Sequence, residues 1–107
     1  MLSLQSAAVQ YTTLGKTGLR ISRLAFGAGP VAGVMTGEDR DRQLRIVSRA
    51  IDAGINWFDT AATYGQGRSE ESLGQALREL NAHDRVHLAT KVRLMPEELD
   101  DISSAVR

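Results

Sequence analysis

Cysteine is absent from the 107 residues of this sequence, so disulfide bonds and thiolate metal sites are excluded. An excess of either charge is also absent, because 13 basic side chains balance 13 acidic ones and no run of Lys or Arg occurs. Such a chain offers no electrostatic footprint to nucleic acid or to an anionic membrane surface. We therefore expect no nucleic-acid partner, no membrane partner and no metal site.

Long apolar segments are missing as well. No stretch approaches the roughly 20 apolar residues that a membrane-spanning helix needs. Residues 1–10 have neither the basic region nor the long apolar core of a secretion signal. With 42% hydrophobic and 24% charged residues, the composition is that of a globular protein. We expect a soluble, cytoplasmic protein with one domain over residues 11–107 and a flexible lead over residues 1–10.

The first elements that the sequence predicts are a β-hairpin and a strand. Residues 11–13 and 19–21 flank the turn 14–18, whose glycines suit positive φ angles. Residues 22–26 are typical of a strand, and they lead into the glycine-rich loop 27–33. The predicted order is therefore hairpin, strand and loop.

Two amphipathic helices are predicted downstream. The first has Thr36 and Asp39 as a variant capping box and Gly54 as its C-terminal stop. The second has Ser69 as its N-cap, followed by acidic residues at the positive end of the helix dipole. Apolar residues recur at helical spacing in both, at Leu44, Val47 and Ile51 and at Leu73, Ala76, Leu77 and Leu80.

Strands alternate with these helices. Residues 55–58 form the second predicted strand and residues 86–92 the third, and Pro96 opens a further helix. This alternation is typical of a parallel α/β fold, because parallel neighbours need a crossover that is usually helical. A (β/α)8 barrel takes about 250 residues, so the chain carries about three of the eight strands. We expect it to be truncated within the helix after the third strand.

The most informative motifs lie between residues 54 and 92. An apolar strand ends in Asp59-Thr-Ala, a Tyr-Gly pair follows at Tyr64, the pattern Ser-Glu-x-x-Leu-Gly begins at Ser69, and the third strand ends in Thr-Lys91. Together these motifs resemble the signature of the aldo-keto reductase family. Residues 14–22 also resemble the hairpin that closes the bottom of those barrels. The resemblance implies the N-terminal part of a (β/α)8 TIM barrel that begins with a β-hairpin.

The predicted strand ends place reactive side chains close together, and this inference does not depend on that resemblance. Asp59 ends the second predicted strand and Lys91 ends the third, so both side chains can emerge at the same edge of a parallel sheet, with strands about 4.8 Å apart. We expect an ion pair between them. Tyr64 lies on the loop that leaves the second strand, where a neighbouring ammonium group would favour the phenolate. Such a tyrosine suits general acid catalysis near neutral pH.

The resemblance assigns roles to these residues. It implies that Tyr64 protonates a carbonyl oxygen while hydride passes from a nicotinamide to the carbonyl carbon, and that Lys91 and Asp59 support this step. The cofactor would contact the backbone of Gly27, Ala28 and Gly29, and also Asp59. It implies NADP(H) rather than NAD(H), and a small carbonyl compound or sugar as the substrate.

The chain has two histidines, His83 and His87, that could fill the fourth catalytic position, which the family places after its fourth strand. His87 lies four residues before Lys91, which puts it about 13 Å below the strand edge. His83 belongs to the connection at the opposite end of the barrel. Neither fills the role, so we expect the fourth residue beyond Arg107.

Three alternatives remain at this point. The first is a dinucleotide-binding turn, suggested by the spacing of Gly27, Gly29 and Gly33. In that motif the helix begins at the glycines, whereas here it begins later. Asp59 also lies about 30 residues after the glycines, where about 20 is usual for the acidic residue. The second is a non-catalytic, cofactor-binding regulatory subunit on the same barrel, as in potassium-channel β subunits. The third is that the chain alone is inactive, and needs the remainder of the barrel or a second copy to fold stably.

Overall fold

The computed structural model describes residues 8–92 and Glu97, and it opens with an antiparallel hairpin. Strand β1 (Tyr11–Thr13) pairs with β2 (Arg20–Ser22). Two glycines of the connecting turn have positive φ, 51° at Gly15 and 80° at Gly18, as expected for a tight hairpin. The predicted hairpin is therefore confirmed, although its second strand extends to Ser22.

A parallel sheet of three short strands follows. Its order is β3 (Phe26–Gly27), β4 (Trp57–Asp59) and β5 (His87–Ala89), so β4 is central. The prediction of one strand over 22–26 is wrong, because Ser22 belongs to the hairpin. The backbone amide of Arg23 also extends the hairpin pairing by donating to the Gln10 carbonyl at 2.7 Å.

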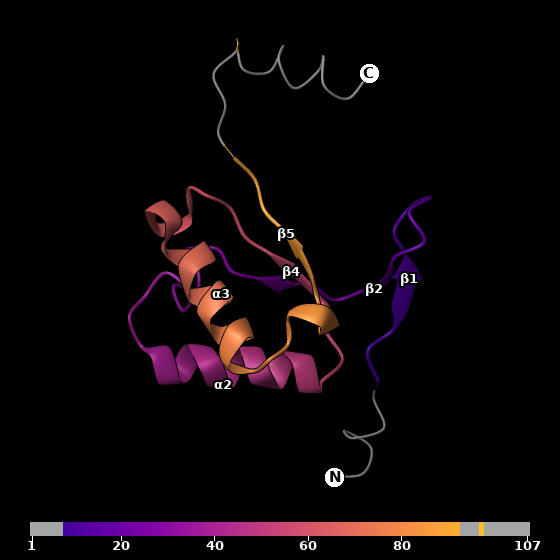
Figure 1. Cartoon of the computed structure of the whole chain (residues 1–107), viewed down its shortest axis with the longest axis horizontal. Helices are drawn as coiled ribbons and strands as arrows, with labels where there is room; N and C mark the ends of the chain where they lie inside the picture. The colour runs from indigo at the N-terminus through magenta and orange to yellow at the C-terminus, as the bar shows by residue number, and fades with distance from the viewer. Residues whose placement is uncertain (1–7, 93–96, 98–107) are drawn as a thin grey trace.

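Two α-helices pack on one face of this sheet, α2 (Arg40–Asp52) and α3 (Arg68–Glu79) (Figure 1). Phe58 at the middle of β4 points to that face, where it is fully buried and stacks on Phe26 with ring centroids 4.9 Å apart. Burial of such a side chain contributes about 1.5–3 kcal/mol. The other large core side chains are Met35, Val47, Leu73 and Leu77.

The helix starts differ from the predicted caps. Asp39 is the N-cap of α2 and accepts a hydrogen bond from the Arg42 amide at 3.0 Å, whereas Thr36 lies in the preceding turn. Ser69 is not the N-cap of α3; Gly67 is, with φ 94°, and Ser69 lies inside the first helical turn. Ser69 stands four residues before Leu73, so the helical period places it on the buried stripe.

Side-chain contacts fasten the hairpin to the bottom of the sheet. The Ser22 amide donates to Asn56 Oδ1 at 2.7 Å, and the Asn56 amide donates to Ser22 Oγ at 3.0 Å. The Tyr11 hydroxyl donates to the Gly54 carbonyl at 2.6 Å. Gly54 has φ 98°, and a Cβ there would lie 2.8 Å from the Tyr11 oxygen, so only glycine fits this docking point.

Two predictions fall partly or wholly outside the described residues. The lead over residues 1–10 is described only from residue 8 on, and the helix from Pro96 only at Glu97. Short 3-10 helices, η1 (Tyr64–Gly67) and η2 (His83–Arg85), complete the assigned elements. Within residues 8–92 and at Glu97, no helix has the length and apolar character needed to cross a membrane.

Candidate active site

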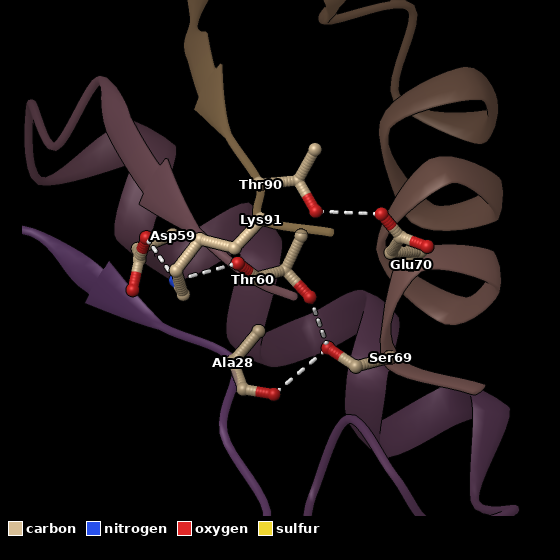
Figure 2. A network of polar contacts seen from close by, with 7 residues as sticks. All are labelled: Ala28, Asp59, Thr60, Ser69, Glu70, Thr90 and Lys91. Carbon is tan, nitrogen blue, oxygen red and sulfur yellow. Dashed lines mark hydrogen bonds and ion pairs between the residues drawn. The ribbon is translucent and has the colours of Figure 1, made fainter. Parts of the chain in front are cut away.

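Strand register brings Asp59 and Lys91 together at the carboxyl edge of the sheet. Asp59 pairs with Gly27 on one side and with Ala89 on the other. Lys91 follows Ala89 by two residues, and side chains two residues apart point to the same face of extended backbone. Lys91 Nζ lies 3.0 Å from Asp59 Oδ1, so the expected ion pair is present (Figure 2).

The Lys91 ammonium has further partners at this edge. It donates to the Thr60 carbonyl at 2.8 Å, and it lies over the Tyr64 ring, 5.4 Å from the centroid. Its hydrogen bond to Asp59 is the largest influence and raises the pKa of Lys91 above the ordinary 10.5. Desolvation opposes this rise, and the charge of Asp59 and the neighbouring Tyr64 add to it. Lys91 is therefore a cation throughout the neutral range.

Tyr64 is held over the site by an unusual backbone. The three residues after it, Gly65, Gln66 and Gly67, all have positive φ, at 62°, 57° and 94°. A Cβ on Gly65 would lie 3.0 Å from the Thr36 methyl carbon, so the loop before α2 packs directly on this turn. A non-glycine residue such as Gln66 is rarely left-handed, and its conformation marks a locally constrained segment.

The glycine-rich segment after β3 lies beside Tyr64. A Cβ on Gly29 would be 3.8 Å from the Tyr64 ring, and one on Gly27 would meet nothing within 4 Å. Ala28 is 1% exposed, and its amide donates to the Asp59 carbonyl at 2.9 Å. The Ala28 amide is thus already used by the sheet, which leaves Gly27 and Gly29 as the more accessible of the three predicted cofactor contacts.

Two buried hydroxyl groups under the site were not predicted from the sequence. Thr60 Oγ1 lies 2.7 Å from Ser69 Oγ, which donates to the Ala28 carbonyl at 2.8 Å (Figure 2). Ser69 was interpreted as a helix cap, and Thr60 as part of a motif without a role of its own. The helical spacing from Ser69 to Leu73 was the signal that the serine points inward.

The two histidines lie away from the cluster. His87 is the first residue of β5, paired with Trp57, so it stands at the end of the strand opposite to Lys91. His83 belongs to η2, which precedes β5. The cluster of Asp59, Tyr64 and Lys91 therefore has no histidine among the residues that the structure describes.

Comparison with known proteins identifies the scaffold. The model of the Aldo/keto reductase family matches residues 23–106. Aldo-keto reductase YhdN of Bacillus subtilis is 39% identical over 87 residues, which are 80% of this chain and 26% of that protein. A probable voltage-gated potassium channel subunit beta of Oryza sativa subsp. japonica is 43% identical over 72 residues, 67% of this chain and 21% of that protein.

Solved structures agree with these sequence matches. An aldo-keto reductase from Klebsiella pneumoniae in complex with NADPH superposes with a TM-score of 0.64 and 29% identity, covering 79% of this chain and 28% of that one. The chain spans about a quarter of the length of these relatives. Sequence, fold and strand-edge motifs thus agree, and the chain belongs to the aldo/keto reductase family, with the fold of the N-terminal part of its (β/α)8 barrel.

Proposed function

We propose that the protein carrying this chain is an NADPH-dependent reductase of aldehydes or ketones, or in reverse a sugar or alcohol dehydrogenase, with Tyr64 as the proton donor. The observation that carries the proposal is the position of the Lys91 ammonium. It lies 3.0 Å from the Asp59 carboxylate and 5.4 Å from the centre of the Tyr64 ring. A cation at this place stabilises a phenolate, which is the state that Tyr64 reaches after giving up its proton.

Each of the three residues has a separate task in this proposal. Tyr64 donates its hydroxyl proton to the carbonyl oxygen, where negative charge develops in the transition state. Lys91 offsets the charge left on Tyr64. Asp59 and the Thr60 carbonyl fix the ammonium in place, at 3.0 and 2.8 Å, so that it needs no reorganisation during the reaction.

A nicotinamide cofactor supplies the hydride in such chemistry. The residues present fit a flat ring at the carboxyl end of β3, because Gly27 and Gly29 carry no side chain there and Gly29 faces the Tyr64 ring. NADP(H) is proposed over NAD(H) with the support of the Klebsiella pneumoniae relative in complex with NADPH. In (β/α)8 barrels the phosphate groups are frequently held by loops after strands 7 and 8.

The proposal is tested with the full-length protein and a Tyr64→Phe variant. We expect wild type to oxidise NADPH in the presence of a reactive aldehyde. The variant should lose at least about 100-fold in kcat while the Kd of NADPH stays within about twofold, since the hydroxyl acts only in the transition state. Near-normal reduction by Tyr64→Phe would show that Tyr64 is not the acid. Fluorescence titration with NADPH provides the control for an intact cofactor site.

A second candidate function is a cofactor-binding regulatory subunit. It is favoured by the similarity to the Oryza sativa potassium channel subunit beta, at 43% identity. Such a protein would bind NADPH but turn over carbonyl compounds very slowly, so the wild-type turnover rate separates the two functions. The complete set of Asp59, Tyr64 and Lys91 in one cluster favours the enzyme.

We also propose that further polypeptide covers the open side of β5. Leu88 on this strand is 50% exposed and Val92 just after it is 66% exposed, although both are apolar. In the described part of the chain, β5 is an edge of the sheet. Exposed edges and apolar side chains favour association. The remainder of the barrel, or a second copy, would provide the covering surface.

A further inference from the structure

Beneath the candidate site, buried hydroxyl groups connect three chain segments that are distant in sequence. Ser69 Oγ is the meeting point: it donates to the Ala28 carbonyl at 2.8 Å and contacts Thr60 Oγ1 at 2.7 Å. A serine has a single hydroxyl hydrogen, and the Ala28 carbonyl is only an acceptor. That hydrogen therefore goes to Ala28, and Thr60 must be the donor to Ser69. The direction of all the hydrogen bonds is fixed.

The buried environment makes this chain of hydrogen bonds hard to break. Ser69 is 0% exposed and Thr60 is 4% exposed, so neither hydroxyl has water as an easy substitute. Removing one member leaves a buried polar group without its partner, which costs about 1–3 kcal/mol. All buried side-chain nitrogen and oxygen atoms that the structure describes have hydrogen-bond partners, so no unpaired buried group is present there to replace a lost partner.

Thr60 joins this series of hydrogen bonds directly to the Lys91 ammonium. Its side chain binds Ser69, its amide donates to the Ala89 carbonyl at 2.8 Å, and its own carbonyl accepts from Lys91 Nζ at 2.8 Å. Figure 2 shows the contacts from Lys91 through Thr60 and Ser69 to Ala28 as one connected network. The orientation of the Thr60 peptide therefore determines where one of the two anchors of the ammonium lies.

Ala28 carries the same constraint to the glycine-rich segment. Its carbonyl accepts from Ser69, and its amide donates to the Asp59 carbonyl at 2.9 Å. Gly29, which follows, faces the Tyr64 ring. One serine on α3 thus fixes both the support of Lys91 and the backbone beside Tyr64.

We propose that Thr60 and Ser69 are positioning residues for the carbonyl-reducing site, which hold the Lys91 ammonium against Tyr64 through a buried relay that ends at Ala28. This inference rests on the proposed function for its kinetic consequence only. Neither residue touches substrate in the proposal; both act through Lys91 and through the segment after β3.

The test uses the full-length protein with matched threonine variants. Thr60→Val keeps the shape and removes the hydroxyl, whereas Thr60→Ser keeps the hydroxyl. Thr90→Val is the control: the Thr90 hydroxyl also links the end of β5 to α3, through Glu70 Oε2 at 2.6 Å, but it is solvent-exposed and outside the relay. Ser69→Ala interrupts the relay at its second member.

We expect Thr60→Val and Ser69→Ala to lower kcat about tenfold, with kcat calculated per functional cofactor-binding site. Both should also shift the pH profile of kcat, because a displaced ammonium supports Tyr64 less well. Thr60→Ser and Thr90→Val should stay within about twofold of wild type. If Thr60→Val lowered only the unfolding temperature, with kcat and the pH profile unchanged, the positioning role would be refuted. This threonine pair decides the matter even if Ser69→Ala fails to fold.

A second measurement is independent of turnover. Acetylation of Lys91 by acetic anhydride at pH 9 is followed by mass spectrometry, with the exposed Lys16 of the hairpin as internal reference. Displacement of the ammonium from Asp59 and Thr60 lowers the pKa of Lys91, so Thr60→Val should raise its relative acetylation rate about threefold. An unchanged rate would overturn the proposal. A raised rate in a protein without reductase activity would uphold positioning while rejecting the proposed function.

Discussion

Replacement of Gly65 by alanine should be among the most destabilising additions of a single methyl group in this chain, and the contacts around Gly65 give the expected loss in free energy of unfolding. Gly65 has φ 62°, a left-handed conformation that costs an L-residue about 1–2 kcal/mol. The added Cβ would also lie 3.0 Å from the Thr36 methyl carbon and 3.1 Å from Arg68 Cβ, and such overpacking costs about 1–3 kcal/mol. We expect Gly65→Ala to lower the free energy of unfolding by about 2–5 kcal/mol.

Two other glycines separate these contributions. Gly67 has φ 94° but no atom within 4 Å of a Cβ, so Gly67→Ala carries the backbone strain alone, about 1–2 kcal/mol. Gly74 lies inside α3 with open space around it, so Gly74→Ala should stabilise by about 0.5–1 kcal/mol through helix propensity. From most to least stable, the expected order is therefore Gly74→Ala, wild type, Gly67→Ala and Gly65→Ala.

The assay is urea unfolding of the full-length protein, followed by circular dichroism, with kcat measured on the folded variants. Gly65→Ala should also reduce kcat, because Gly65 follows Tyr64 and any relief of the contact with Thr36 moves the tyrosine. A Gly65→Ala protein no less stable than Gly67→Ala would contradict this prediction, because the close approach to Thr36 would then cost no free energy.

Two further predictions concern the docking of the hairpin and the ion pair. Tyr11→Phe removes the hydrogen bond to the Gly54 carbonyl and should lower the free energy of unfolding by about 0.5–1.5 kcal/mol in urea titrations, an effect that would be absent if the hairpin docked by apolar contact alone. The pKa of Lys91 is raised from 10.5 in the folded state, so the stability it contributes is fully present below about pH 10.5 and is lost as the pH rises through the folded pKa. Urea midpoints of wild type and Asp59→Asn should therefore differ at pH 7 and converge in strong alkali, and a constant difference would contradict this linkage.

Much of the strand edge was predictable because it depends on register alone. Asp59 and Lys91 end neighbouring parallel strands, and any parallel pairing brings their side chains to the same edge. The spacing of apolar residues likewise gave both helices, whose buried stripes include Val47, Leu73 and Leu77. These are local or strictly periodic signals, and they do not depend on how loops fold.

The details that were missed depend on tertiary contacts. Ser69 next to two glutamates is typical of a helix cap. In the structure the N-cap of α3 is Gly67, so Ser69 lies within the first helical turn and is buried. The strand predicted over residues 22–26 starts only at Phe26, and Ser22 instead pairs with Tyr11 in the hairpin and exchanges hydrogen bonds with Asn56, 34 residues away. A sequence pattern contains no signal for such partners. The left-handed Gln66 was equally invisible, since glutamine has no preference for that conformation.

Steady-state turnover of the full-length protein most directly tests whether the cluster of Asp59, Tyr64 and Lys91 reduces carbonyl compounds. NADPH oxidation is measured with a reactive aldehyde for wild type, Tyr64→Phe and Lys91→Met, with NADPH binding titrated for each. We expect turnover by wild type and its near-complete loss in both variants, which still bind NADPH. Wild-type protein that binds NADPH but turns over no faster than Tyr64→Phe would contradict this expectation and would favour the regulatory subunit.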